Sequence, residues 1–412
     1  MRPNIRKNFS ALSCLHSFKE IPLPSIIKCF KNIKNYYPIV LGLTCHWYDV
    51  KTCKYKRNLM SRLLVFSINL GGMILIIIIL ADYMKEFKHS PNVHPLMKFV
   101  TSTNFQIRII LVAFTLGHIL QHDAPIAKLK MQLEALEQRC QTIIKPSLKT
   151  QVRFKRLYYL KCFLVSYIYM AIFGVGLVAL PNDIDLRKIL VVIVYGNTMS
   201  QWCMILFQYF QLLWKICCLL YQMEEYLSDV AKGYDDTCRN HTSEKQACTK
   251  LSWLLVTHSQ LCRLLQELER NFKWQLLISR WANITTNSIT LYFAFAFHKT
   301  LYDSVGILYS GGLTYLMLIC DLYLNDYLCD MTAQSFDDLE MALKVFNNIN
   351  YQGKMLDQEC EEFSFYVCNQ KLNLTLAGAL NLNRQSWFSM MSALVMNAIV
   401  LIQSHLRTSF DE

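Results

Sequence analysis

Few side chains in this sequence have the types and spacing that catalysis or metal binding requires. There is no G-x-x-x-x-G-K-S/T phosphate loop, no G-x-S-x-G nucleophile elbow and no H-E-x-x-H metal pair. His118 and His122 are four residues apart and would share one face of a helix. No third ligand is spaced to join them, so the end of an apolar segment meeting water is favoured over a metal site. We therefore expect no enzymatic activity, no metal and no cofactor.

The last apolar segment, residues 385–406, carries the clearest functional pattern. Asn397 and Ser404 are seven residues apart and fall near one face of a helix, with Val400 and Gln403 beside that stripe. In an oligomer, one such helix from each subunit could line a pore with an apolar ring next to amide groups. Alternatively, the polar side chains could join helices within one bundle. The residues alone leave both interpretations open.

A second set of residues could form a ligand cavity. Arg108 is the one basic residue inside an apolar segment, where a charge requires a partner or water. It could line such a cavity, although a buried pairing or a position close to the membrane surface is favoured. Aromatic side chains are frequent in the apolar segments, and those in a cavity would suit a small, flat, mostly apolar ligand. The aromatic candidates are Tyr167, Phe173, Trp202, Tyr292 and Phe295.

The composition indicates how these residues are positioned. In 412 residues, 53% are hydrophobic and 17% are charged, which is too apolar for soluble domains. Backbone groups in lipid must bond within their own segment, and the apolar segments lack the alternation of a membrane barrel, so helices are expected. The predicted fold is an all-α, polytopic membrane protein with seven transmembrane helices. The predicted spans are 63–81, 99–121, 162–180, 189–214, 281–297, 304–320 and 385–406.

Basic residues predict the orientation. The connections on one side hold 34 of the 42 Lys and Arg residues, and the opposite side holds seven. Because basic residues resist translocation, we expect a cytoplasmic amino terminus and an extracellular carboxyl terminus. The predicted organisation begins with a cytoplasmic segment, 1–62. Six spans follow within 63–321, with cytoplasmic helical extensions at 122–161 and 215–280. A cytoplasmic anchor at 322–384 then leads to a pore-lining helix with a short extracellular tail, 385–412. The net charge of +12 is explained by this topology and contact with membrane lipid, not by nucleic acid.

Three further segments carry structural signals. Leucines between 251 and 268 recur at helical spacing on one face, which predicts packing against other inside helices. Residues 372–382 are apolar but too short to cross a bilayer, and we interpret them as the first half of a broken last helix. Residues 36–48 are also too short and are predicted to lie at the membrane interface or to dock against the rest of the protein.

Residues 377–384 (Ala-Gly-Ala-Leu-Asn-Leu-Asn-Arg) and the last span resemble the insect gustatory receptors, relatives of the insect odorant receptors. That family ends in Thr-Tyr, five apolar residues and Gln-Phe; this chain has Met396-Asn397, five apolar residues and Gln403-Ser404. The resemblance implies a ligand-gated, non-selective cation channel of four identical or different gustatory receptor subunits in the plasma membrane of sensory neurons. It places Gln403 at the gate with Val400 and Ser404 beside it. The implied ligand is a tastant, most often bitter or aversive.

Two other classes of membrane protein also have several helical spans. A receptor coupled to a G protein would have its amino terminus outside, and would usually carry prolines in its late spans and an Asn-Pro-x-x-Tyr element. All nine prolines lie at or before Pro181. A transporter would more often show a repeated half and several ionisable groups at mid-membrane. The sequence favours the channel over both.

Overall fold

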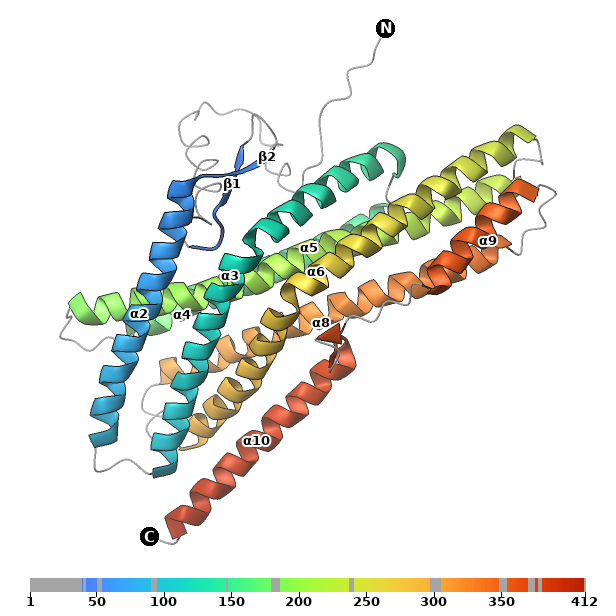
Figure 1. The fold of residues 1–412 in the computed structure, drawn as a ribbon. Coiled ribbons are helices and arrows are strands. Elements are labelled where there is room, and N and C mark those ends of the chain that lie inside the picture. The colour runs from blue at the N-terminus through green and yellow to red at the C-terminus, as the bar shows by residue number, and fades with distance from the viewer. Residues whose placement is uncertain are drawn as a thin grey trace, which may run out of the picture.

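The computed structural model describes eleven segments of the chain, in which eight helices carry the fold (Figure 1). The described residues are 39, 42–49, 54–89, 95–145, 147–178, 186–236, 241–296, 305–347, 354–369, 375–376 and 380–410. The helices are α2 (Leu59–His89), α3 (Pro95–Ile143), α4 (Leu148–Val178), α5 (Leu186–Asp236), α6 (His241–Ala296), α8 (Val305–Asn347), α9 (Lys354–Asn369) and α10 (Arg384–Phe410). Every predicted span falls within one of these helices wherever its residues are described.

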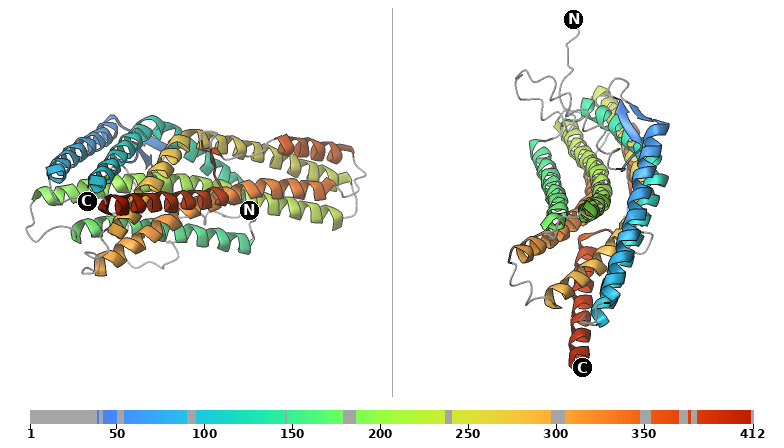
Figure 2. Two further views of the ribbon diagram at one scale, coloured as in Figure 1. Left: turned by 90° about the horizontal axis from the view of Figure 1, so that it is seen from below. Right: turned by 90° about the vertical axis from the view of Figure 1, so that its left-hand side faces the viewer.

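Several helices continue far beyond the length that a bilayer needs. About 20 residues cross the apolar layer, whereas α3, α5, α6 and α8 contain 49, 51, 56 and 43 residues. Their additional turns, with α9, form an elongated bundle at one end of the molecule (Figure 2). Four stretches of the described chain are long and apolar enough to cross a membrane. They are Leu59–Ile78, Leu96–Ile143, Ser200–Gly233 and Arg384–Arg407.

The extension of α6 confirms the amphipathic pattern predicted for 251–268. Its regularly spaced leucines are buried in the main core, where α6 contacts α3, α5 and α9. The buried members are Leu251, Leu254, Leu261, Leu264, Leu265 and Leu268. Since a helix that buries one apolar stripe needs a partner for it, this pattern alone was enough to predict an interhelical bundle.

The predicted second span ends at residue 121, and α3 runs on without interruption to Ile143, within the helical extension predicted for 122–161. Pro125 lies inside this helix and cannot donate the backbone hydrogen bond that an interior residue normally makes. Figure 1 shows α3 changing direction near its middle. One helix therefore joins the predicted span to the extended bundle.

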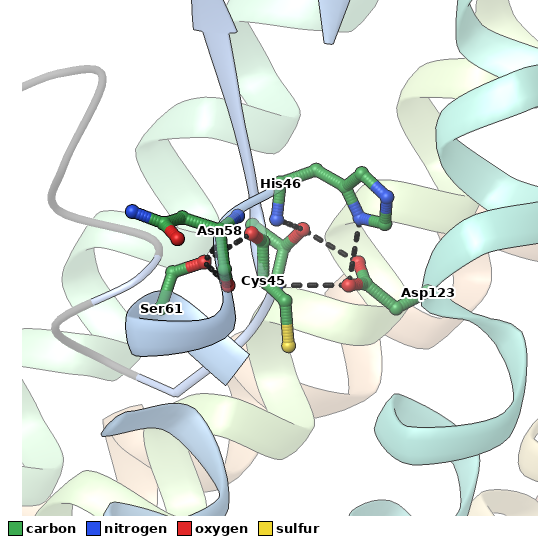
Figure 3. A network of polar contacts seen from close by, with 6 residues as sticks. Cys45, His46, Asn58, Ser61 and Asp123 are labelled. Carbon is green, nitrogen blue, oxygen red and sulfur yellow. Dashed lines mark hydrogen bonds and ion pairs between the residues drawn. The ribbon is translucent and has the colours of Figure 1, made fainter. Parts of the chain in front are cut away.

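The amino-terminal segment docks through a set of polar contacts (Figure 3). Asp123 of α3 accepts hydrogen bonds from Thr44 Oγ1 at 2.5 Å and from Cys45 N at 2.8 Å, and it pairs with His46 Nδ1 at 2.8 Å. Ser61 Oγ donates to the Cys45 carbonyl at 2.8 Å. One carboxylate thus satisfies three groups of the segment and fixes it to α3.

A close backbone approach adds to this docking. Gly42 has a φ of +73°, a conformation that favours glycine, and a Cβ there would lie 2.8 Å from Asn69 Nδ2. The amide of Asn69 instead donates to the Gly42 carbonyl at 2.8 Å. Beyond this turn, β1 (His46–Asp49) and β2 (Lys54–Arg57) form an antiparallel hairpin with Trp47 opposite Lys56. This hairpin is a small departure from an all-α fold.

The interpretation of 372–382 as half of a helix is wrong for the described residues of that segment. β3 (Thr375–Leu376) and β4 (Leu380–Asn381) pair antiparallel, with Leu376 opposite Leu380. Leucines at 372, 374 and 376 alternate with Asn373 and Thr375, and this period of two is typical of a strand. The helix that precedes α10 is α9, which begins earlier in the chain.

His258 of α6 is fully buried in the bundle, outside the apolar spans. Its ring contacts Phe336, Phe363 and Tyr366 with centroid separations of 5.1, 6.0 and 5.9 Å, and Cys262 Sγ lies 3.5 Å from its Nδ1. None of these groups is a carboxylate that could stabilise an imidazolium. Burial lowers the pKa of His258 from 6.5 to about 4.

We expect acid to weaken this bundle through His258. In the unfolded chain His258 takes up a proton below pH 6.5, whereas in the folded chain it does so only near pH 4. The stabilisation that neutral His258 provides is therefore complete above pH 6.5 and is lost as the pH falls from 6.5 to 4. The expected loss is about 3 kcal/mol. Unfolding in detergent micelles at several pH values should show that His258→Phe, which cannot be protonated, loses less. Equal pH dependence of the two proteins would contradict this account.

Candidate functional site

The last helix, α10, is fastened to the bundle along one face. It begins after Asn383, whose side-chain oxygen accepts a hydrogen bond from Ser386 N at 2.8 Å and so caps the helix. Met390, Leu394 and Ala398 recur every four residues and are buried, where α10 packs on α6 and α8. α10 then descends along the margin of the molecule and ends at its tip (Figures 1 and 2).

Two polar contacts strengthen this attachment of α10 to α6. Ser288 Oγ donates to the Leu394 carbonyl at 3.1 Å. One turn further along α6, Tyr292 Oη lies 3.1 Å from His405 Nδ1, and the Tyr292 side chain is fully buried. The two contacts span three turns of α10, so they fix its rotation about its own axis as well as its position.

The candidate pore residues lie on the other side of α10. Asn397, Val400, Gln403 and Ser404 are all exposed in the single chain, and Val400 is 58% exposed. Apolar residues on the same helix are exposed with them. They are Phe388, Val395, Met396, Ile399 and Leu406. The chain therefore presents an uncovered face on α10 that combines apolar and amide side chains, which is the kind of surface that contacts lipid or other subunits.

The candidate ligand residues are distributed over separate clusters. Trp202 donates from Nε1 to Ser279 Oγ at 2.8 Å and packs with Ile107 and Ala282. Tyr292 belongs to a different cluster, with Ile289. The structure thus brings Trp202 close to Ile107, the residue before Arg108 in α3, but it places Tyr292 against α10.

The remaining candidates are less enclosed. Arg108 is partly buried, and its Nε lies 3.5 Å from Asn104 Oδ1 one turn away. Tyr167 is half-buried, and Phe295 is 38% exposed. The side chain of Phe173 lies outside the described residues. A cavity lined by these residues stays a prediction.

Sequence reasoning missed a row of ion pairs on α8. Asp321 pairs with Lys161 of α4 at 2.6 Å, and this lysine is fully buried. The other two pairs of the row are Asp326 with Arg280 of α6 and Asp330 with Arg384 of α10. The signal in the sequence is three aspartates within ten residues directly after an apolar span.

The Arg280–Asp326 pair borders a small cavity of about 20 Å³ between α5, α6, α8 and α10. This volume holds about one water molecule, because a water needs roughly 10–15 Å³ of such space. Asn325 Oδ1, which lines the cavity, is buried without a partner among the described residues. A bound water would satisfy it, and the cavity is too small for a tastant.

His118 and His122 share a helix face as predicted, with stacked rings 5.0 Å apart. His122 Nδ1 contacts Asn271 Oδ1 at 3.1 Å, and Gln275 Nε2 donates to Thr115 Oγ1 at 3.1 Å. These contacts join α3 to α6. Among the described residues no three His, Cys, Asp or Glu side chains gather as a metal site would require.

A bundle of long helices, several apolar enough to cross a membrane, with an uncovered last helix, defines a polytopic helical membrane protein. Residues 35–408 match the family described as 7tm Chemosensory receptor. The chain belongs to this chemosensory receptor family. The match extends from the segment docked on α3 through almost all of α10, so it covers the complete helical fold described above.

Curated relatives and a solved structure agree with this assignment. A putative gustatory receptor 22b of Drosophila melanogaster is 21% identical over 155 residues, which are 38% of this chain and 40% of that protein. A putative gustatory receptor 59b of Drosophila erecta is 23% identical over 188 residues, 44% of this chain and 31% of that protein. The matched segments thus span less than half of these relatives. The resemblance to insect gustatory receptors is confirmed.

The solved structure is the insect olfactory receptor OR5 from Machilis hrabei in complex with eugenol. Its fold matches with a TM-score of 0.61 over 92% of this chain and 99% of that chain, at 12% sequence identity. The arrangement of helices is therefore shared with an insect olfactory receptor, although few side chains are the same.

The Arg280–Asp326 pair gives a stability prediction. Removing one partner of a buried ion pair leaves an uncompensated charge, at a cost of about 3 to 5 kcal/mol, whereas replacing both with apolar residues is often neutral. We expect Asp326→Leu to lower the free energy of unfolding by about 3 kcal/mol or more. The double variant Arg280→Met/Asp326→Leu should recover most of that loss. Unfolding of the solubilised chain measures both. A double variant as unstable as the single one would argue against this pairing.

Proposed function

We propose that this chain is a subunit of a ligand-gated, non-selective cation channel that detects taste compounds. Four subunits, identical or different, would place α10 of each around a shared central axis in the plasma membrane of a sensory neuron. The observation that carries the proposal is the division of α10 into a buried face and an uncovered face. The buried face is held by Ser288 and Tyr292, and the uncovered face carries Asn397, Val400 and Gln403.

The gate is proposed on this uncovered face. Val400 would supply an apolar constriction and Gln403 an amide ring one turn away, and together they would control the wetting of the pore. Ser404 and Asn397 lie at the two ends of this stripe and are less bulky than the aromatic residues that the family pattern carries there. Such a pore would be easier to hydrate than one ringed by aromatic side chains.

The proposed ligand is a small, mostly apolar molecule of the bitter or aversive kind. The matching olfactory receptor was solved with eugenol, a ligand of that size and polarity. Arg108, Tyr167, Phe173, Trp202, Tyr292 and Phe295 are the proposed ligand contacts. In this chain Tyr292 contacts both the cluster around Val100 of α3 and His405 of α10, so a ligand near it could shift the last helix directly.

The orientation gives the first test of this proposal. With the basic connections on the cytoplasmic side, residue 1 would be inside and residue 412 outside. A tag on the carboxyl end should bind antibody in intact cells, and a tag on the amino end only after permeabilisation. A carboxyl tag that stays hidden until the membrane is opened would overturn the proposed topology.

The pore role of α10 gives the second test. Gln403→Cys should make agonist-evoked currents sensitive to a water-soluble thiol reagent, because the proposed pore is wet at that position. Leu394→Cys is the matched control, since Leu394 is 1% exposed on the opposite face of the same helix. Currents through Gln403→Cys that the reagent leaves unchanged, in a channel that still opens, would exclude a lining role.

A further inference from the structure

A second cavity lies between the extended parts of α3 and α6, away from α10. It has a volume of about 220 Å³ and is open on one side. On each helix the lining residues fall on successive turns of one face, and both helices turn that face toward the cavity. These residues are Gln132, Ala135, Leu136 and Arg139 of α3 and Gln260, Arg263 and Leu264 of α6.

The charge around this cavity is one-sided. Two arginines on facing helices, Arg139 of α3 and Arg263 of α6, line it, and no Asp or Glu is among the lining residues. Glu137, an acidic neighbour of Arg139 in the sequence, pairs instead with Lys215 at 2.9 Å. Arg263 and Glu267 are 4.0 Å apart with the arginine 64% exposed, a weak contact. Positive charges that face one cavity repel each other, and a bound anion would remove that repulsion.

The side-chain amide of Gln132, which also lines the cavity, requires a partner. Gln132 Oε1 is buried and accepts no hydrogen bond from any described residue. A water, an ion or a ligand could supply that partner. Because a glutamine amide can turn to present either its oxygen or its NH₂ group, Gln132 and Gln260 can serve a ligand that both accepts and donates. An oxyanion that also carries hydroxyl groups has this character.

We propose that this cavity binds a small phosphorylated anion. Arginine forms paired, charge-assisted hydrogen bonds with phosphate oxygens, and two arginines on facing helices can hold one diphosphate or two neighbouring phosphate groups. The volume of about 220 Å³ is below the roughly 300–1,000 Å³ of most drug-sized sites, which suits a compact polar ligand. The bound anion would join α3 to α6.

The position of the cavity favours a soluble ligand over a lipid headgroup. Gln132 lies about 16 Å along the helix beyond the end of the predicted span at residue 121, from the 1.5 Å rise per residue. With the proposed topology the cavity opens to the cytosol, and that assignment of the side rests on the proposed function. Anion binding itself does not depend on channel activity.

Thermal unfolding of the purified full-length chain in detergent, with added diphosphate at constant ionic strength, tests the proposal. We expect a saturable rise in the unfolding temperature. Arg139→Gln and Arg263→Gln should each weaken the apparent affinity about tenfold or more, by loss of charge-assisted hydrogen bonds. Arg156→Gln makes the same charge change at an exposed site on α4 and should bind as the wild type does.

A variant that fills the cavity without changing the charge distinguishes binding in the cavity from non-specific electrostatic attraction of the anion. Ala135 is exposed and lines the cavity, so Ala135→Trp should block binding without altering folding. The proposal is overturned if Ala135→Trp binds diphosphate normally, or if Arg156→Gln weakens binding as much as the cavity variants do. It is also overturned if neither diphosphate nor the phosphorylated lipid raises the unfolding temperature. Nanodiscs with and without phosphatidylinositol bisphosphate supply the lipid measurement: stabilisation by this lipid alone, lost in Arg139→Gln, would retain the site and assign its ligand to the membrane.

Discussion

Three aspartates on α8 determine how the helices of this receptor meet. Asp321, Asp326 and Asp330 are each paired with a basic side chain from a different helix, namely Lys161 of α4, Arg280 of α6 and Arg384 of α10. The first two pairs are largely withdrawn from water, and an unpaired charge there would cost several kcal/mol. The helices can therefore slide or rotate only within the limits that keep each pair together. α8 is the common partner.

The attachment of α10 follows from this constraint. Arg384 ties its first residue to α8, and its guanidinium lies 5.8 Å from the Tyr327 ring. Ser288 and Tyr292 of α6 then hold the helix further along. The Arg280–Asp326 pair joins α6 to α8 and so restricts their relative position. α10 therefore packs on two helices that are already held together.

The parts of the fold that could be predicted from sequence are those set by local pattern. Apolar segments located the helices because burial of a helix in lipid requires about 20 consecutive apolar residues, and the leucine spacing of 251–268 revealed a packed face. The parts that could not be predicted depend on distant partners. Arg280 and Asp326 are 46 residues apart, and the local sequence around each residue does not indicate its partner. At 372–376 the alternation of Leu with Asn and Thr favours a strand, whereas the length and apolar character of 372–382 favour a short helix, so the local pattern is ambiguous there.

The sequence by itself determined a helical membrane protein, the positions of its apolar helical segments, its kinship with insect gustatory receptors and the polar stripe on the last helix. All of these depend on residue type and on spacing along one segment. Only the tertiary structure decided which face of α10 is buried, that Trp202 and Tyr292 belong to different clusters, and that Arg139 and Arg263 line one cavity. These properties arise when faces of separate helices meet, and the meeting is set by the packing and ion pairing of the whole bundle.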